Sequence, residues 1–243
     1  MFELFKKINS RRPATSPSRS SEKAAQAPAS GPKAAPAMER ADGASRTPDR
    51  TSAPGSANAP APEQIAPQFD AGLIQSVMND TFPGLTMYVR DVDLPKELEE
   101  RYVPGEFLRE LGFTDASARV MGMVTTHRFA ILSNHMGDLS AFEHGTNWGL
   151  HVANKGSRFK VLDICRYQGK TQILLLHLPD DHRWKLFEKA TFSLEEDLIK
   201  SCRQRFENKC CLPPVPELAT PEWKARCADP IGMDAAGVRF SLD

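Results

Sequence analysis

The spacing of apolar residues along the chain predicts helices at the two ends of a folded region. Leu73, Ile74 and Val77 recur at helical intervals, so residues 70–80 are predicted to form an amphipathic helix. Residues 193–209 show a similar pattern, because apolar residues return every four positions after a Ser-x-x-Glu capping sequence. Shorter helices are predicted for residues 94–102, 104–113 and 220–227, each of which begins near a proline.

The middle of the chain has the composition of β-strands. Runs rich in β-branched and aromatic residues occupy positions 85–92, 119–133, 147–153, 158–167 and 171–179. Gly156 and Gly169 lie in the short connections on either side of the fourth run and predict hairpin turns. The last run is apolar on both faces, which is typical of a central strand covered by helices. These patterns predict an α+β fold, in which an antiparallel sheet of about four to six strands forms a meander and packs against N- and C-terminal helices.

The first quarter of the chain lacks such patterns. Residues 10–67 are rich in alanine, proline and serine, and contain Met38 and Ile65 as their large apolar residues. So little apolar surface cannot offset a backbone entropy cost of about 1–2 kcal/mol per residue. We therefore predict a long disordered N-terminal arm, whose linker has a root-mean-square span of about 40 Å. A single α+β globular domain is predicted to follow over residues 68–243.

A short amphipathic segment, residues 1–9, precedes the linker. Its apolar residues follow a helical spacing and are Met1, Phe2, Leu4, Phe5 and Ile8. A segment this short does not form a stable helix alone, so we predict that it folds on contact with a partner. The sequence leaves two kinds of docking surface open, a groove on a protein partner or the surface of a membrane.

The charge and the cysteines narrow the class of protein. The chain carries 31 basic and 31 acidic residues, and its first 67 residues hold ten of the former and six of the latter. The folded region is therefore weakly acidic, which argues against nucleic acid as a partner. No apolar run is long enough to cross a membrane, and the N-terminus does not resemble a secretory signal. The five cysteines are then expected to be reduced thiols, which predicts a cytoplasmic protein, peripheral at a membrane if the tip binds lipid.

Histidines and acids gather in two loops and are the candidate catalytic or metal-binding residues. The first loop contains His135, Asp138 and His144, and the second contains Asp180, Asp181 and His182. Carboxylates beside histidines can bind a divalent cation or activate water, so the two loops would form one site if they met in space. The second loop has a simpler interpretation, in which Asp180 or Asp181 caps the helix that follows.

Two further histidines are predicted to be structural. His127 shares a strand face with Phe129 and Ile131, and His177 lies at the end of the apolar run 171–179. A histidine on an apolar strand face is usually a neutral ring whose polar atoms are hydrogen-bonded.

The tripeptide His144-Gly145-Thr146 is similar to the nicotinamide-contacting motif of ADP-ribosyltransferases. In those enzymes the tripeptide lies on a strand, and a tyrosine-bearing segment and a late catalytic glutamate follow it. Here the preceding residues, 137–143, do not form an apolar strand pattern. The resemblance covers three residues, and no site residue is transferred on its account.

The sequence lacks the G-x-G-x-x-G and GxxxxGK(S/T) motifs of common nucleotide-binding enzymes. It also lacks the G-x-S-x-G motif of serine hydrolases and the C-x-x-C motif of dithiol proteins. We therefore expect a non-enzymatic binding or adaptor domain, tethered through its flexible arm and without a cofactor. The alternative is a metal-assisted hydrolase, whose His/Asp site would be built from the loops 135–144 and 177–182 around a divalent metal.

Overall fold

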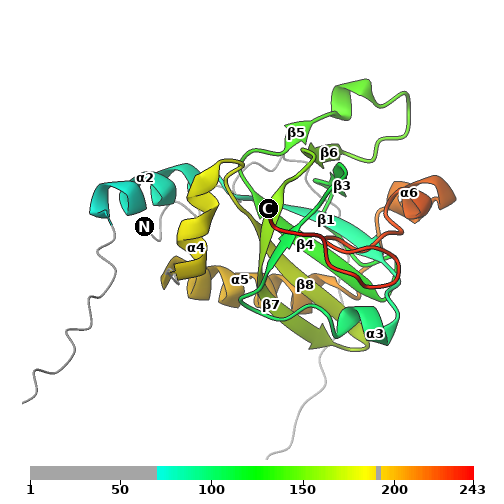
Figure 1. The fold of residues 1–243 in the computed structure, drawn as a ribbon. Coiled ribbons are helices and arrows are strands. Elements are labelled where there is room, and N and C mark those ends of the chain that lie inside the picture. The colour runs from blue at the N-terminus through cyan, green and yellow to red at the C-terminus, as the bar shows by residue number, and fades with distance from the viewer. Residues whose placement is uncertain (1–69, 190–192) are drawn as a thin grey trace, which may run out of the picture. The chain divides into compact units, whose positions relative to one another are not determined.

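A computed structural model describes residues 70–189 and 193–243 (Figure 1). The predicted docking segment and linker lie outside the described residues, and both stay predictions. The helices are α2 (Ala71–Thr81), α3 (Lys96–Glu99), α4 (Leu186–Lys189), α5 (Ser193–Lys209) and α6 (Pro221–Arg226), with short 3₁₀ turns η1 (Ser140–Phe142), η2 (His182–Lys185) and η3 (Pro216–Ala219). The strands are β1 (Thr86–Val92), β2 (Phe107–Arg109), β3 (Thr114–Ser117), β4 (His127–Ser133), β5 (Gly137–Asp138), β6 (Leu150–Ala153), β7 (Arg158–Tyr167) and β8 (Lys170–His177).

The mixed α+β class is confirmed, but the sheet is larger than predicted and its order is not a meander. One sheet holds 8 strands in the order β2-β7-β8-β4-β1-β3-β6-β5. Most neighbours are antiparallel, whereas β4 and β8 run parallel in the middle of the sheet. The first strand lies between β3 and β4, and all of its residues after Thr86 are buried, including Arg90 and Asp91.

The two predicted hairpins have different outcomes. Gln168 and Gly169 both adopt positive φ and connect β7 directly to its antiparallel neighbour β8. Gly156 also has positive φ, but β6 and β7 are not paired, since β6 lies between β3 and β5. A local turn signal therefore predicts the reversal of the chain, and not the partner of the strand that enters it.

The helix predicted for residues 104–113 is wrong. Residues Phe107–Arg109 form the edge strand β2, which pairs with the first residues of β7. Leu108 is buried in this position, whereas a helix would leave the start of β7 paired on one side only, with β8. Pairing with a distant strand thus overrides a local helical preference.

Helices cover one face of the central strands (Figure 1). Val77 of α2, Phe187 of α4, and Leu198 and Cys202 of α5 pack against strand residues of β1, β4 and β8. Asp70 caps α2 by accepting a hydrogen bond from the Gly72 N–H at 2.9 Å. None of the described helices combines the length and the apolar character needed to cross a lipid bilayer.

The opposite face of the sheet is covered by irregular chain. Phe129, Ile173 and Leu175 of the central strands pack there against Tyr102 and Ile231. The C-terminal segment, red in Figure 1, crosses the strands and follows α6. Each large aliphatic side chain buried in this way stabilises the fold by about 1.5–3 kcal/mol.

Two ion pairs attach α5 to β7 along its length. The Lys160 ammonium lies 2.9 Å from both carboxylate oxygens of Glu195, and both side chains are almost fully buried. Arg203 lies eight residues after Glu195 on the same helix and donates to both oxygens of Asp163 at 2.6 and 2.7 Å. The helix is therefore held by charged contacts as well as by its apolar stripe.

A buried ion pair joins β1 to β4 at the centre of the sheet. Arg128 donates to both oxygens of its cross-strand partner Asp91, at 2.6 and 2.8 Å. The same guanidinium donates to the carbonyl oxygens of Met121 and Gly122. Gly122 forms an isolated parallel bridge with Pro214, beyond the end of α5, so the ion pair is connected to the C-terminal half.

We predict that Gly122→Ala destabilises the protein, because the added Cβ would lie 1.6 Å from the Leu212 carbonyl oxygen. Displacing this backbone contact should lower the free energy of unfolding by about 1–3 kcal/mol, measured by urea denaturation. Gly137→Ala is the matched control, since its added Cβ would meet nothing closer than the Val152 carbonyl oxygen at 3.6 Å. Equal stability of the two variants would contradict the packing described for Gly122.

Candidate functional site

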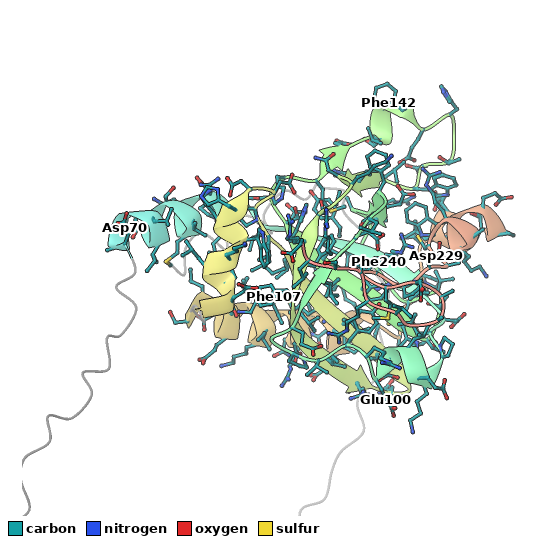
Figure 2. The ribbon with its side chains drawn as sticks, viewed as in Figure 1. Asp70, Glu100, Phe107, Phe142, Asp229 and Phe240 are labelled. Carbon is teal, nitrogen blue, oxygen red and sulfur yellow. The ribbon has the colours of Figure 1, made fainter. Side chains whose placement is uncertain are left out.

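A cavity of about 310 Å³ lies between the loop that connects β2 to β3 and the C-terminal segment that follows α6. Asp229 and Phe240, both labelled in Figure 2, belong to its wall. The remaining lining residues are Arg90, Glu110, Gly112, Phe113, Thr114, Arg226, Pro230, Ile231, Met233, Asp234 and Ala235. Its volume falls at the lower end of the range for small-molecule sites.

Arg90 is the buried charged residue of this wall. Its side chain comes from the middle of β1, and the residue is 5% exposed. The guanidinium donates to the carbonyl oxygen of Asp229 at 2.9 Å and reaches that of Asp115 at 3.5 Å. Its Nε has no hydrogen-bond partner, and no ion pair is formed by Arg90 among the described residues. A permanent charge is therefore buried here, and its hydrogen bonds among the described residues go to carbonyl oxygens.

Two acidic residues near Arg90 have other partners. Glu110 accepts hydrogen bonds from the N–H groups of Gly112 and Gly232, both at 3.0 Å. Asp115 forms an ion pair with Arg226 at 2.7 Å, which brings a second cation to the cavity wall. The lining also contains Asp229 and Asp234, so the charge of Arg90 is balanced only at a distance and not by an ion pair.

Aromatic rings complete the wall. Phe113 is 58% exposed, an unusual position for a large apolar side chain, and Phe240 is half-buried. The Lys155 ammonium lies 5.1 Å from the centre of the Phe113 ring. The cavity therefore combines a buried cation with open aromatic surface.

The sequence analysis did not identify Arg90. A signal was present, because Arg90 stands between Tyr88 and Val92 on the strand face that carries the buried core. A charged residue at an inward position of an apolar strand requires either an ionic partner or a ligand.

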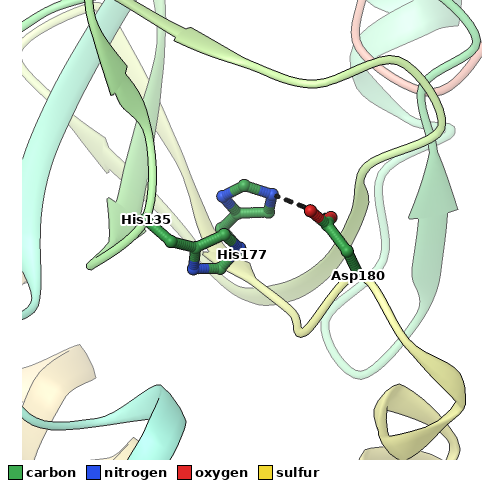
Figure 3. Close-up of side chains that lie close together, drawn as sticks. All are labelled: His135, His177 and Asp180. Carbon is green, nitrogen blue, oxygen red and sulfur yellow. Dashed lines mark ion pairs between the residues drawn. The ribbon is translucent and has the colours of Figure 1, made fainter.

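Of the six candidate residues, the structure brings two together, with a third that was predicted to be structural. His135, His177 and Asp180 each offer a ligand atom within 4.8 Å of the other two (Figure 3). His177 ends β8 and His135 follows the end of β4 by two residues. Since β4 and β8 are parallel neighbours, their carboxyl ends meet at the same edge of the sheet.

The other four candidates do not join this group. Asp138 lies on β5, where its carboxylate accepts from the Ser140 N–H and lies 3.8 Å from His151. His144 is exposed in the loop before β6. Asp181 accepts from the Arg183 N–H at 2.9 Å and caps η2, so the capping interpretation is confirmed for this residue. His182 is exposed as the first residue of η2.

His177 is buried between two rings. The ring centre of His135 lies 3.9 Å away on one side, and that of Phe159 lies 4.9 Å away. Its Nδ1 lies 2.8 Å from the Ser133 hydroxyl oxygen. Burial, and secondarily the neighbouring His135, lower the pKa of His177 to about 3. Burial also lowers the pKa of His135, against opposing contributions from Asp180 and the Leu178 carbonyl.

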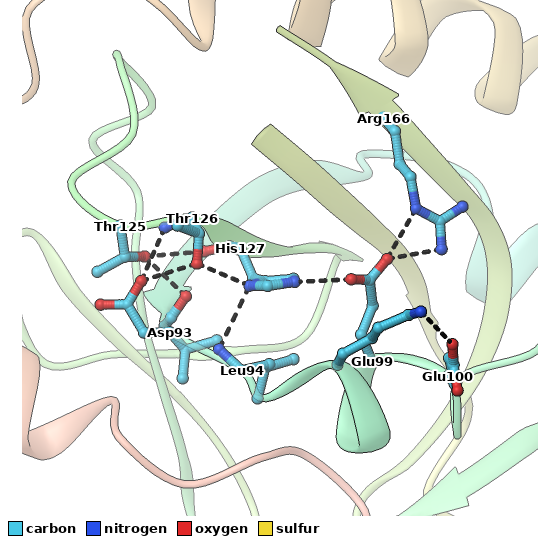
Figure 4. Close-up of polar contacts among 10 residues, drawn as sticks. Asp93, Leu94, Glu99, Glu100, Thr125, Thr126, His127 and Arg166 are labelled. Carbon is cyan, nitrogen blue, oxygen red and sulfur yellow. Dashed lines mark hydrogen bonds and ion pairs between the residues drawn. The ribbon is translucent and has the colours of Figure 1, made fainter. Parts of the chain in front are cut away.

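His127 confirms the structural interpretation (Figure 4). Its Nδ1 accepts from the Leu94 N–H at 3.3 Å, and its Nε2 lies 3.1 Å from Glu99. Glu99 also forms an ion pair with Arg166 at 2.6 Å. Burial works against ionisation of Glu99, yet the hydrogen bonds from His127 and Arg166 hold its pKa below the usual value.

The tripeptide His144-Gly145-Thr146 is not on a strand. It forms a bend between η1 and β6. The Glu143 carboxylate shapes this loop by accepting hydrogen bonds from the Trp148 N–H, the Leu150 N–H and the Thr146 hydroxyl. The strand placement that the resemblance to ADP-ribosyltransferases requires is therefore not found.

No protein-family model matches the sequence. No curated protein matches it either.

Solved structures with local similarity include bacterial effectors and toxins. The type III effector XopAI from Xanthomonas axonopodis pv. citri is 18% identical over 44% of this chain and 46% of its own, with a TM-score of 0.34. The ADP-ribosyltransferase HopU1 of Pseudomonas syringae pv. Tomato is 16% identical over 39% of this chain and 46% of its own, at 0.34. Exoenzyme S from Pseudomonas aeruginosa, in complex with human 14-3-3 protein beta and bound to carba-NAD, is 15% identical over 43% of this chain and 54% of its own, at 0.33. The chain thus spans about half the length of these proteins.

These neighbours contradict the expectation of a non-enzymatic binding or adaptor domain, because ADP-ribosyltransferases are enzymes. The expectation that this chain is only a protein-binding module is corrected for the same reason. The alternative expectation, a metal-assisted hydrolase, required the loops 135–144 and 177–182 to form one site, and of its six candidate residues only His135 and Asp180 come together, with His177. At these TM-scores the likeness transfers neither a fold assignment nor a substrate to this chain.

The depressed pKa of His177 predicts a loss of stability in acid. Its folded pKa of about 3 lies below the usual 6.5, so the unfolded chain takes up the proton first as the pH falls. The stability that the neutral ring contributes is complete above pH 6.5 and is lost progressively toward pH 3. We expect the free energy of unfolding, measured with a chelator present between about pH 6.5 and pH 4.5, to fall less steeply in His177→Asn.

His144→Asn, which replaces an exposed histidine, is the control and should retain the wild-type pH dependence. The same slope in wild type and His177→Asn would show that the buried ring does not resist protonation.

Proposed function

We propose that this protein binds a phosphate-bearing ligand of the nucleotide type in the cavity around Arg90. The observation that carries the proposal is the buried Arg90 guanidinium, whose Nε is unpartnered and which has no ionic partner among the described residues. Burying an unpaired charge costs several kcal/mol, a cost that a bound anion would offset. Arginine suits phosphate because its planar fork donates two parallel hydrogen bonds.

The rest of the wall supports a ligand larger than phosphate alone. The rings of Phe113 and Phe240 offer aromatic surface on which a base can stack, and such stacking contributes about 1–3 kcal/mol per base. Arg226 adds a cation on the same wall. A volume of about 310 Å³ accommodates a ligand of nucleotide size that remains partly open to solvent.

We predict that ADP raises the melting temperature of the wild-type protein and that Arg90→Met abolishes the rise. At a hundred times its dissociation constant a ligand stabilises by about 2.7 kcal/mol, which corresponds to about 5–10 °C in a domain of this size. Methionine keeps most of the side-chain volume and removes the charge, so the unliganded variant is expected to fold. Inorganic phosphate and NAD, tested in parallel, report how much of a nucleotide the cavity accepts.

The matched control is Arg166→Gln, which removes an arginine whose side chain is 62% exposed and which pairs with Glu99 away from the cavity. It should keep the wild-type response to ADP. A rise of equal size in Arg90→Met, or no rise with any of the three compounds, would disprove the proposal.

A further inference from the structure

We infer that His135, His177 and Asp180 form a binding site for a divalent transition-metal ion of the zinc class (Figure 3). Their three ligand atoms lie within 4.8 Å of one another and come from two segments, the chain after β4 and the end of β8 with the turn that follows it. The site is separate from the Arg90 cavity, with which it shares no lining residue. The inference concerns ion binding and assigns no reaction to the ion.

The unpartnered Nε2 of His177 points to a missing ligand. His177 is 1% exposed, and this nitrogen has no hydrogen-bond partner among the described residues. Buried polar atoms are rarely left in this state. The Asp180 oxygen that faces Nε2 lies 4.0 Å away, which is too far for a hydrogen bond and leaves room for an ion between the two atoms.

The second nitrogen of each ring is already held. The Nδ1 of His177 lies 2.8 Å from the Ser133 hydroxyl oxygen, and the Nδ1 of His135 lies 2.8 Å from the Asn134 side-chain oxygen. Metal-binding histidines characteristically donate their other N–H to such a partner, which fixes the tautomer and the ring orientation. With Nδ1 donating in both rings, each Nε2 keeps the lone pair that a metal requires, and at His135 the ion would compete with the hydrogen bond that the protonated ring makes to the Leu178 carbonyl.

The ligand set selects the class of ion. Two imidazole nitrogens and one carboxylate oxygen suit zinc and its neighbours, whereas magnesium and calcium prefer oxygen ligands throughout. Tetrahedral bonds of about 2.0–2.1 Å place ligand atoms about 3.3 Å apart, so both Asp180 and the His135 ring, which stacks on His177, must rotate toward the ion. The Asp180 side chain is 51% exposed and free to rotate. It also lines a second cavity of about 310 Å³, which gives the ion access and leaves a position for a further ligand.

The test is a titration of the full chain with Zn²⁺, followed by calorimetry, and with Co²⁺, followed by absorption. We expect one ion per chain at this site, and at least about a 10–100-fold loss of affinity in Asp180→Asn, the range known even for groups that only support a metal ligand. Asp181→Asn is the matched control, because Asp181 is the adjacent acid but caps η2 instead. Its affinity should equal that of wild type.

Two outcomes would overturn the inference. One is equal affinity of wild type, Asp180→Asn and His177→Asn for Zn²⁺, or no binding at all. The other is an intense near-ultraviolet charge-transfer band with Co²⁺, which marks thiolate ligands and would place the ion at cysteines. His177→Asn changes a buried residue, so the folding of this variant is checked by thermal melting without metal. If His177→Asn does not fold, the test rests on Asp180→Asn, which changes an exposed residue.

Discussion

The ion pair between Asp91 and Arg128 is the interaction on which the arrangement of this fold depends. Its two residues are cross-strand partners at the centre of the sheet, and both are almost fully buried. Removing one partner of such a pair typically costs about 3–5 kcal/mol, because the other charge is left uncompensated. Here the guanidinium also binds the carbonyl oxygens that precede β4, so one buried cation positions two strands and the irregular segment leading to the bridge with Pro214.

Arg90, the residue next to Asp91 on the same strand, shows the opposite situation. Its side chain points to the other face of the sheet and meets backbone carbonyls in place of a carboxylate. The two arginines are equally buried, yet one charge is neutralised within the fold and the other is not. A fold that neutralises one buried charge completely and leaves its neighbour open reserves the second for a ligand, which is the physical basis for the proposed function.

At the edge of the sheet where β4 and β8 end, strand pairing again brings polar side chains together in a buried position. Parallel pairing places Ser133 beside His177, and the chain then turns His135 back over the buried ring. The two imidazoles stacked at 3.9 Å would repel each other if both were protonated, and burial keeps His177 neutral. Tautomers held by Ser133 and Asn134 leave lone pairs facing Asp180, so the packing that keeps the rings neutral also prepares them as ligands.

By itself, the sequence determined the features that depend on residues a few positions apart. These are the cap at Asp181, the turn at Gln168–Gly169, the apolar stripe of α5 and the central position of β8. Only the tertiary structure decided the order of the strands, the strand character of Phe107–Arg109 and both candidate sites. The groups that meet there are 44 positions apart for Ser133 and His177, and 139 apart for Arg90 and Asp229. Periodicity and capping are set by neighbouring backbone geometry, whereas such distant contacts are selected by the burial and pairing of whole strands, which no local pattern records.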